Sequence, residues 1–349
     1  NLKNQKNFIF GGYAFDPSAS YTSIWENLPL GHFILPRYIF CNSRLIINFF
    51  SKSEISKSEI EKVIFDYVNY LEVFLNNKES DYNSELLELS DITNKEIYLN
   101  HIRDVINNLN NTNSILTKVV LSRIKKGSFS KKVPILKIIK KLLFNNKHNM
   151  NFLYPIDDYY LIGSTPELIL SVTDNKILSE SLAGSNYKAS SNEFISDAKQ
   201  ITEQKIVTDY ILDIFKHYSK KINFNKVPVI KKTSNIEHLC TTISAVINEK
   251  VNIFDLMRDL HPTPAISGFP KSDAMEKIKD IKENRGWYGG PIGWIDNNLN
   301  GKFFLNIRSG LISNDNIYLF SGSGITKESN IHDEWGETEQ KFNSMINAL

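Results

Sequence analysis

Short apolar runs separated by turn residues open the chain. FIFGGYAF, HFILPRYIF and SRLIINFF occur within the first 50 residues, and short apolar runs bounded by Gly, Pro, Asn or Ser are typical of β-strands. Similar segments return at 118–129, at 151–185 and at 287–324. These four regions are predicted to supply the strands of the fold.

Two other parts of the chain place charged and apolar residues at helical spacing. Residues 53–113 include SEIEKVIFDYVNYLEVFL and KEIYLNHIRDVINNL, which predicts surface helices packed on a sheet. Residues 193–222 predict one long amphipathic helix, with Ile201, Ile211 and Ile214 among its apolar positions.

The order of these segments indicates the class of fold. Strands, helices, strands, one helix and strands follow one another, without the repeated strand–helix unit of a parallel sheet. This order favours an α+β fold with large antiparallel sheets. No stretch rich in Pro, Gly or Ser divides the chain, so residues 1–349 are predicted to form a single domain.

Composition excludes several classes of protein. The 349 residues are 41% hydrophobic and 23% charged, as in ordinary globular proteins. The net charge is +2 and no basic block carries interleaved aromatic residues, so nucleic acid is not an expected partner. No apolar run approaches the ~20 residues that span a bilayer, and the start of the sequence lacks the apolar core of a signal peptide. With Cys41 and Cys240 far apart, a cytoplasmic protein without a membrane partner is expected.

Several charged residues are candidates for chemistry, although each is ordinary when taken singly. Lys118 in KVVLSR could be an exposed strand residue, and Glu167 in STPEL could be a turn residue. Glu334 and Glu337 are three positions apart, so a helix would present both carboxylates on one face.

Ten unusual strings occur in one order over most of the chain. They are GGYAFDP, KVVLSR, IGSTPE, LAGS, KxxxE, LHPTPAISGFP, RGWYGGPIGW, NIRSG, SGSGI and EWGET. In these strings the sequence resembles the chorismate-utilising family, which includes the anthranilate, aminodeoxychorismate, salicylate and isochorismate synthases. The resemblance runs from about Phe8 to the C-terminus. It implies a chorismate-binding catalytic domain with the anthranilate synthase component I-like fold, in which two large antiparallel β-sheets pack together with helices outside.

Two of the strings indicate the subtype. Residues 260–270 and 285–294 resemble isochorismate synthases, because anthranilate and salicylate synthases tend to carry a different string at 261–263. The resemblance therefore implies an isomerase that adds water at C2 of chorismate and removes the C4 hydroxyl. Aminodeoxychorismate synthases carry a nucleophilic lysine at the place of Ala183, and an alanine leaves water as the nucleophile.

That reaction needs a base, an acid and a cation. Chorismate is a dianion, and hydroxide is a poor leaving group, so both proton transfers must be assisted. The resemblance makes Lys118 the base and Glu167 the acid. A lysine acts as a base only when its pKa falls below the free value of ~10.4, and a carboxyl group donates protons near neutrality only when its pKa rises above ~4.3.

The resemblance also implies a magnesium site. Glu203, Glu334 and Glu337 match metal ligands of the family, and carboxylates with waters form the oxygen shell that Mg²⁺ prefers. Relatives usually carry Asp or Glu at the place of Gln200. A neutral amide can still bond a metal-bound water, so Gln200 is expected to support the site with less charge.

The remaining candidates concern the substrate. The resemblance assigns Arg308 and Tyr288 to the enolpyruvyl carboxylate, since both are donors suited to an anion. His238 and His261 also match family positions, and each is either a hydrogen-bonded core histidine or a proton carrier. The full set of expected substrate-binding residues is Ala183, Gly184, Ser185, His238, Thr263, Tyr288, Arg308, Gly322 and Gly324.

Two alternatives stay open. A salicylate synthase performs the same hydration and then eliminates pyruvate. A non-catalytic chorismate-binding protein is disfavoured, because it would not need to retain the candidate base, acid and metal ligands together. No glutamine amidotransferase subunit is expected as a partner, and the product could feed menaquinone, siderophore or salicylate synthesis.

Overall fold

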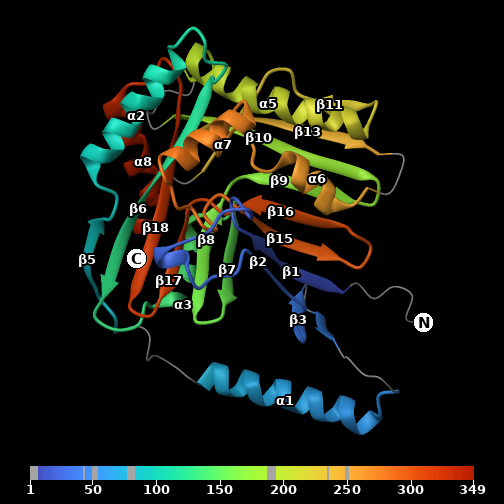
Figure 1. Cartoon of the computed structure of the whole chain (residues 1–349). Helices are drawn as coiled ribbons and strands as arrows, with labels where there is room; N and C mark the ends of the chain where they lie inside the picture. The colour runs from blue at the N-terminus through green and yellow to red at the C-terminus, as the bar shows by residue number, and fades with distance from the viewer. Residues whose placement is uncertain are drawn as a thin grey trace.

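The protein consists of two large antiparallel sheets, a two-stranded hairpin and peripheral helices (Figure 1). A computed structural model describes residues 7–41, 44–48, 54–76, 83–186, 194–233, 236–247 and 251–349. The α+β class with two large antiparallel sheets, predicted from the sequence, is confirmed.

The first sheet joins the N-terminal strands to strands from the middle and the end of the chain. Its order is β11-β13-β10-β9-β16-β15-β1-β2, and β12 also pairs with β13. β1 pairs with β15, with Phe8 opposite Asp296, so distant parts of the sequence share one ladder. The strands are β1 (Phe8–Tyr13), β2 (Gly31–Ile34), β9 (Leu168–Thr173), β10 (Lys176–Asn186), β11 (Ile222–Phe224), β12 (Val229–Lys232), β13 (Glu237–Val246), β15 (Pro291–Asp296) and β16 (Gly301–Leu305).

The second sheet has the order β14-β6-β18-β17-β8-β7, and β5 pairs with β6. Its long central strands run antiparallel, with Val119 of β6 opposite Ile325 of β18. The hairpin is formed by β3 (Tyr38–Cys41) and β4 (Arg44–Ile47). The strands of the second sheet are β5 (Leu86–Asp91), β6 (Lys118–Phe129), β7 (Met150–Ile156), β8 (Tyr159–Thr165), β14 (Gly268–Phe269), β17 (Ser309–Ser313) and β18 (Asn316–Ile325).

Helices cover the sheets from outside. α5 packs on β10 and β13, and α8 packs on β18. Figure 1 shows α1 below the hairpin, apart from the large sheets. In the described part of the chain no helix is both long and apolar enough to cross a bilayer. The helices are η2, a 3-10 helix (Ser23–Trp25), α1 (Lys57–Asn76), α2 (Lys95–Leu109), α3 (Ile135–Asn145), α5 (Ala198–Tyr218), α6 (Ile253–Leu260), α7 (Lys271–Asp280) and α8 (Ile331–Ile346).

The structure corrects two expected helical regions. Within 53–113, strand β5 separates α1 from α2 and pairs with the edge of β6. The helix expected over 193–222 begins later, because the Asp197 side chain accepts hydrogen bonds from the backbone N–H groups of Lys199 and Gln200. An acidic N-cap of this kind satisfies donors that the first helical turn leaves free.

One hydrophobic core connects the two sheets. Leu121 of β6 belongs to the same fully buried cluster as Leu170 of β9, Ile243 of β13 and Phe303 of β16, and Val207 of α5 closes it. Burying a side chain of this size contributes about 1.5–3 kcal/mol. The core therefore fixes the relative position of the strand ends that carry the charged candidates.

The two cysteines have opposite environments. Cys41 ends β3 and is exposed, whereas Cys240 on β13 is buried. Burial raises the pKa of the Cys240 thiol to about 12. No disulfide joins them.

Candidate active site

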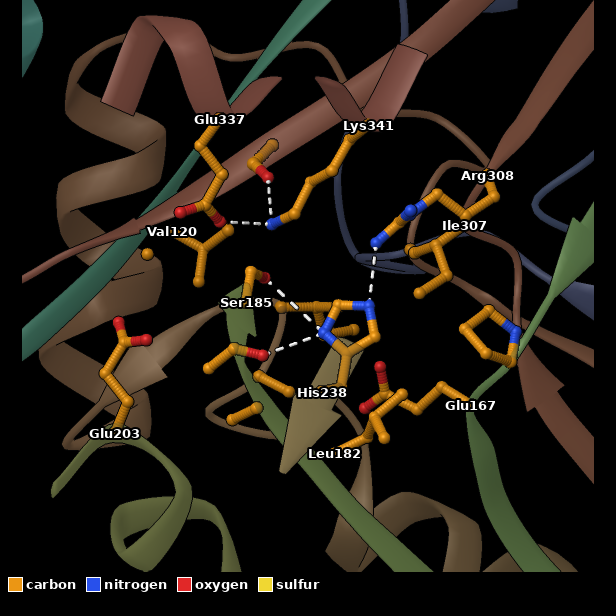
Figure 2. A pocket seen from close by; sticks show the side chains of 18 of the residues that line it. Val120, Glu167, Leu182, Ser185, Glu203, His238, Ile307, Arg308, Glu337 and Lys341 are labelled. Carbon is orange, nitrogen blue, oxygen red and sulfur yellow. Dashed lines mark hydrogen bonds and ion pairs between the residues drawn. The ribbon is translucent and has the colours of Figure 1, made fainter. Parts of the chain in front are cut away.

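A pocket between the two sheets collects most of the candidate residues. It contains about 730 Å³ of empty space, open solvent at its mouth included. Figure 2 shows side chains from β10, β13, α5 and α8 pointing toward it. Thr263 and Glu334 are buried but do not line it. The predicted residues that line the pocket are Lys118, Glu167, Ala183, Gly184, Ser185, Glu203, His238, Tyr288, Arg308, Gly322, Gly324 and Glu337.

Lys118 is the first residue of β6 and is 3% exposed. It pairs with Phe269 of β14, and its Nζ lies 3.8 Å from Oε1 of Glu203. Gly324 of β18 makes room for it, because a Cβ at that position would lie only 2.6 Å from Lys118 Cε. The sequence thus places a buried lysine against a strand that has no side chain at the point of contact.

Glu167 lies in the turn between β8 and β9 and is 5% exposed. Its backbone N–H donates to Oγ1 of Thr165 at 3.3 Å, and its carbonyl accepts from the N–H of Leu305 at 3.1 Å. Burial raises the pKa of the Glu167 carboxyl to about 8, although the charges of Lys118 and Lys231 act to lower that pKa. The carboxyl group therefore holds its proton at neutral pH and can donate it.

The end of β10 is an irregular stretch of strand at the pocket. Pairing with β13 shifts between Ala183 and Asn186, and Gly184 has a φ of +74°, which favours glycine. Gln200 Oε1 accepts a hydrogen bond from the N–H of Ser185 at 2.9 Å. Gln200 thus holds this irregular end of β10, a contact that its sequence position did not predict.

His238 connects the irregular end of β10 to Arg308. Its Nδ1 lies 2.8 Å from the carbonyl oxygen of Gly184, which can only accept, so Nδ1 carries the proton. Nε2 then accepts from Nη2 of Arg308 at 3.1 Å (Figure 2). Burial, reinforced by the Arg308 charge, lowers the pKa of His238 well below its usual value. His238 is thus a neutral, hydrogen-bonded histidine that lines the pocket.

His261 differs from His238, since it does not line this pocket. Its Nε2 donates to the carbonyl of Phe15 at 2.9 Å. Burial lowers the pKa of His261 to about 4. Of the two interpretations offered by the sequence, the contacts of His261 match a core histidine.

Tyr288 and Gly322 form another wall. The Tyr288 ring stacks on Phe320, with ring centroids 5.5 Å apart. Burial raises the pKa of Tyr288 to about 12, so its hydroxyl remains a donor. A Cβ on Gly322 would lie 3.2 Å from the Tyr288 hydroxyl, so the glycine leaves that hydroxyl accessible from the strand.

Glu334 lies in the first turn of α8 and is 2% exposed. Its Oε1 lies 3.2 Å from Nζ of Lys199 and accepts from the Ser329 hydroxyl at 2.6 Å. Its Oε2 is buried and has no hydrogen-bond partner among the described residues. Burial, and then the charge of Glu337, raise the pKa of Glu334 to about 7.

The other two glutamates also face lysines. Glu337 Oε1 lies 2.6 Å from Nζ of Lys341, and Glu203 lies beside Lys118 as described above. Across the residues that the structure describes, no three carboxylate, imidazole or thiol groups are close enough together to hold a metal ion. In chemistry, if not in spacing, the donor set matches a hard cation, because all three candidate ligands are oxygens and the buried Oε2 of Glu334 has no hydrogen-bond partner among the described residues.

Sequence reasoning missed two charged residues of the pocket. Lys341 donates to the carbonyl of Gly322 at 2.9 Å, and its position four residues after Glu337 on a helix was an available signal. Arg285 donates to the carbonyl of Ile266 at 2.6 Å, and it opens the RGWYGGPIGW string. Both residues add positive charge to a pocket that already contains Arg308.

Comparisons with known sequences agree with this arrangement. The profile of the family described as chorismate binding enzyme matches residues 1–349. The isochorismate synthase MenF of Bacillus subtilis is 30% identical over 355 residues, which cover 98% of this chain and 74% of the relative. The vibriobactin-specific isochorismate synthase of Vibrio cholerae is 30% identical over 244 residues, which cover 67% of this chain and 62% of the relative.

Solved structures show the same fold. MenF of Escherichia coli matches with a TM-score of 0.81 and 22% identity over 98% of this chain and 78% of its own. Anthranilate synthase component I of Streptococcus pneumoniae matches with a TM-score of 0.85 and 20% identity over 99% of this chain and 82% of its own. The expected anthranilate synthase component I-like fold is confirmed. With a family match over residues 1–349, and with most of the candidate site residues lining one pocket, the chain belongs to the chorismate-binding enzyme family.

Proposed function

We propose that the protein is an isochorismate synthase, an isomerase that converts chorismate to isochorismate. The observation that carries this proposal is that two buried groups, the Lys118 amine and the Glu167 carboxyl, line the same pocket. Ala183 lines the same pocket and offers no nucleophile, which leaves water to attack the ring. The names of the two sequence relatives described above support the same activity.

The proposed reaction exchanges one water for another. Lys118 removes a proton from the water that forms a bond to C2, and the ring double bonds shift. Glu167 gives its proton to the C4 oxygen, which leaves as water when its bond to the ring breaks. The raised pKa of Glu167, about 8, supports this role because the acid must be protonated before the step.

The substrate carboxylates require cations and donors. We assign Arg308 and Tyr288 to the enolpyruvyl carboxylate, since a guanidinium and a phenol match that anion. Glu203, Glu334 and Glu337 would hold Mg²⁺. When bound, the ion supplies positive charge to the ring carboxylate.

Incubation with chorismate and Mg²⁺, followed by separation and identification of the products, tests the proposal. Isochorismate as the product is expected. Salicylate with pyruvate would instead identify a salicylate synthase, and recovery of unchanged chorismate would identify a binding protein.

We also propose that residues 1–349 act as one catalytic domain in the cytoplasm, without an amidotransferase subunit, and that isochorismate passes to menaquinone or siderophore synthesis.

A further inference from the structure

Lys231 contacts the turn that carries Glu167 from outside the pocket. It lies on β12, directly opposite His238 of β13. Its Nζ donates to the carbonyl oxygen of Pro166 at 2.8 Å and to Oε2 of Glu180 at 2.6 Å. The Lys231 and Glu180 side chains are 26% and 21% exposed, so the ion pair is partly shielded from water.

The contact with Pro166 can fix the orientation of Glu167, because Pro166 immediately precedes it in the chain. The carbonyl oxygen belongs to the peptide group that joins the two residues, so fixing it restricts the direction in which the Glu167 side chain leaves the backbone. The backbone of Glu167 is also held on its other side by Leu305. Loss of Lys231 would leave the carbonyl oxygen of Pro166 without this charged hydrogen-bond donor.

We propose that Lys231, supported by Glu180, is a positioning residue for Glu167, which it holds in place through the carbonyl of Pro166 and near which it places a positive charge. This inference rests on the proposed role of Glu167 as the acid. Lys231 does not line the pocket, so it acts through the turn and through its charge.

The charges around Glu167 come from several elements. Positive charges of Lys118 on β6, Lys231 on β12 and Lys341 on α8 lower its pKa, whereas the negative charge of Glu180 on β10 raises it. The neighbouring Cys240 and Tyr288 have raised pKa values and His238 a lowered one because of burial, so these three are neutral. Arg308 adds a further cation, bonded to His238.

Substitutions of Lys231 and Glu180 are expected to shift the pKa of Glu167 in opposite directions. Lys231→Met removes a cation, so the Glu167 carboxyl should lose its proton at higher pH than in the wild type. Glu180→Gln removes an anion, so the carboxyl should lose its proton at lower pH. A purely structural weakening of the turn would not produce shifts in opposite directions.

The experiment is a ¹³C NMR titration of full-length protein labelled at glutamate side chains, with the Glu167 signal assigned by its absence in Glu167→Gln. The matched control is Lys232→Met, because Lys232 is adjacent on β12, is exposed and pairs with Glu237. We expect the midpoint to rise in Lys231→Met, to fall in Glu180→Gln, and to be unchanged in Lys232→Met and Lys231→Arg. An unchanged midpoint in both Lys231→Met and Glu180→Gln, or a shift of both in one direction, would overturn the inference.

Turnover provides an independent second measurement. In Lys231→Met, kcat should fall by ~10-fold or more with little change in KM, because a displaced acid slows the chemical step more than binding. The high-pH limb of kcat should move with the NMR midpoint. If Lys231→Met does not fold, Glu180→Gln still tests the direction in which the Glu167 midpoint shifts. Opposite NMR shifts in a protein that forms no isochorismate would refute the proposed function and retain Lys231 as the residue that controls Glu167.

Discussion

Glu167 and Glu337 line one pocket, yet their surroundings favour opposite protonation states. Burial acts to raise the pKa of both carboxyl groups. Against burial, Lys341, which lies one helical turn after Glu337 and 2.6 Å from it, acts together with Lys199 and Lys118 to hold the pKa of Glu337 below its ordinary value. Among the described residues no ion pair reaches the Glu167 carboxyl, and its pKa rises to about 8.

The difference divides the pocket into two sides. On the side of α5 and α8, Glu203, Glu334 and Glu337 each face a lysine. On the side of β8 and β13, Glu167 and His238 are both uncharged at neutral pH, which suits proton transfer to a leaving group. Glu334 keeps a raised pKa of about 7 although Lys199 lies 3.2 Å away, so burial and neighbouring carboxylates act together with the lysines in setting the protonation of these glutamates.

Removal of the metal should have the largest effect. Protein dialysed against EDTA is expected to form no detectable isochorismate, because the substrate carboxylate would meet the α8 glutamates without a cation between them. Addition of Mg²⁺ should restore the activity. Product formation is measured by chromatography, and full turnover in metal-free buffer would contradict the assignment of all three glutamates.

Substitution of either proton-transfer group should be next in size. Lys118→Ala and Glu167→Gln are each expected to lower kcat by ~10²–10⁴. Neither change opens a large cavity, so circular dichroism and thermal melting should report a folded protein. A variant with near-normal turnover would remove that residue from the mechanism.

A lysine at the place of Ala183 tests whether water is the nucleophile. Ala183→Lys should lower isochorismate formation by at least ~100-fold, since the longer side chain fills the space assigned to the attacking water. If its amine is deprotonated it can attack C2, and intact mass spectrometry would then detect a chorismate-derived adduct. Normal product formation by the folded variant would show that Ala183 does not border the nucleophile.

The same substitution on the two sides of the pocket sharpens the comparison. Glu334→Gln should raise the Mg²⁺ concentration for half-maximal rate by ~10-fold or more, because one ligand loses its charge. Excess Mg²⁺ should restore its turnover, whereas no Mg²⁺ concentration should restore Glu167→Gln. The rate of each variant is measured against Mg²⁺ concentration. Equal restoration of turnover in both variants would show that Glu334 and Glu167 do not have different roles.

The smallest expected effect concerns stability. The folded pKa of Glu167, about 8, exceeds the ordinary value of 4.5, so its contribution to stability is full below pH 4.5 and is lost as pH rises through 8. Metal-free wild type should therefore lose stability relative to Glu167→Gln over this window, by up to about 1.4 kcal/mol per pH unit. Urea unfolding at several pH values measures the difference, and parallel curves would show that Glu167 ionises normally.

The sequence anticipated the parts of the site that local patterns encode. The three-residue spacing of Glu334 and Glu337 would place both carboxylates on one face of a helix, and α8 contains both. Strand β5 was missed because LLELSD alternates weakly and is recruited as an edge partner of β6, a tertiary effect. The hydrogen bond from Lys231 to the Pro166 carbonyl joins residues 65 positions apart, so no local sequence pattern could reveal it.

The contrasting cysteines make the protein convenient for spectroscopy. Cys41 is exposed at the end of β3, whereas the Cys240 thiol is buried and its pKa of about 12 leaves it unreactive near neutrality. A maleimide dye or nitroxide should therefore attach to a single site without mutagenesis. Because the hairpin belongs to neither of the sheets that line the pocket, the label would report on the hairpin and leave the turnover chemistry undisturbed.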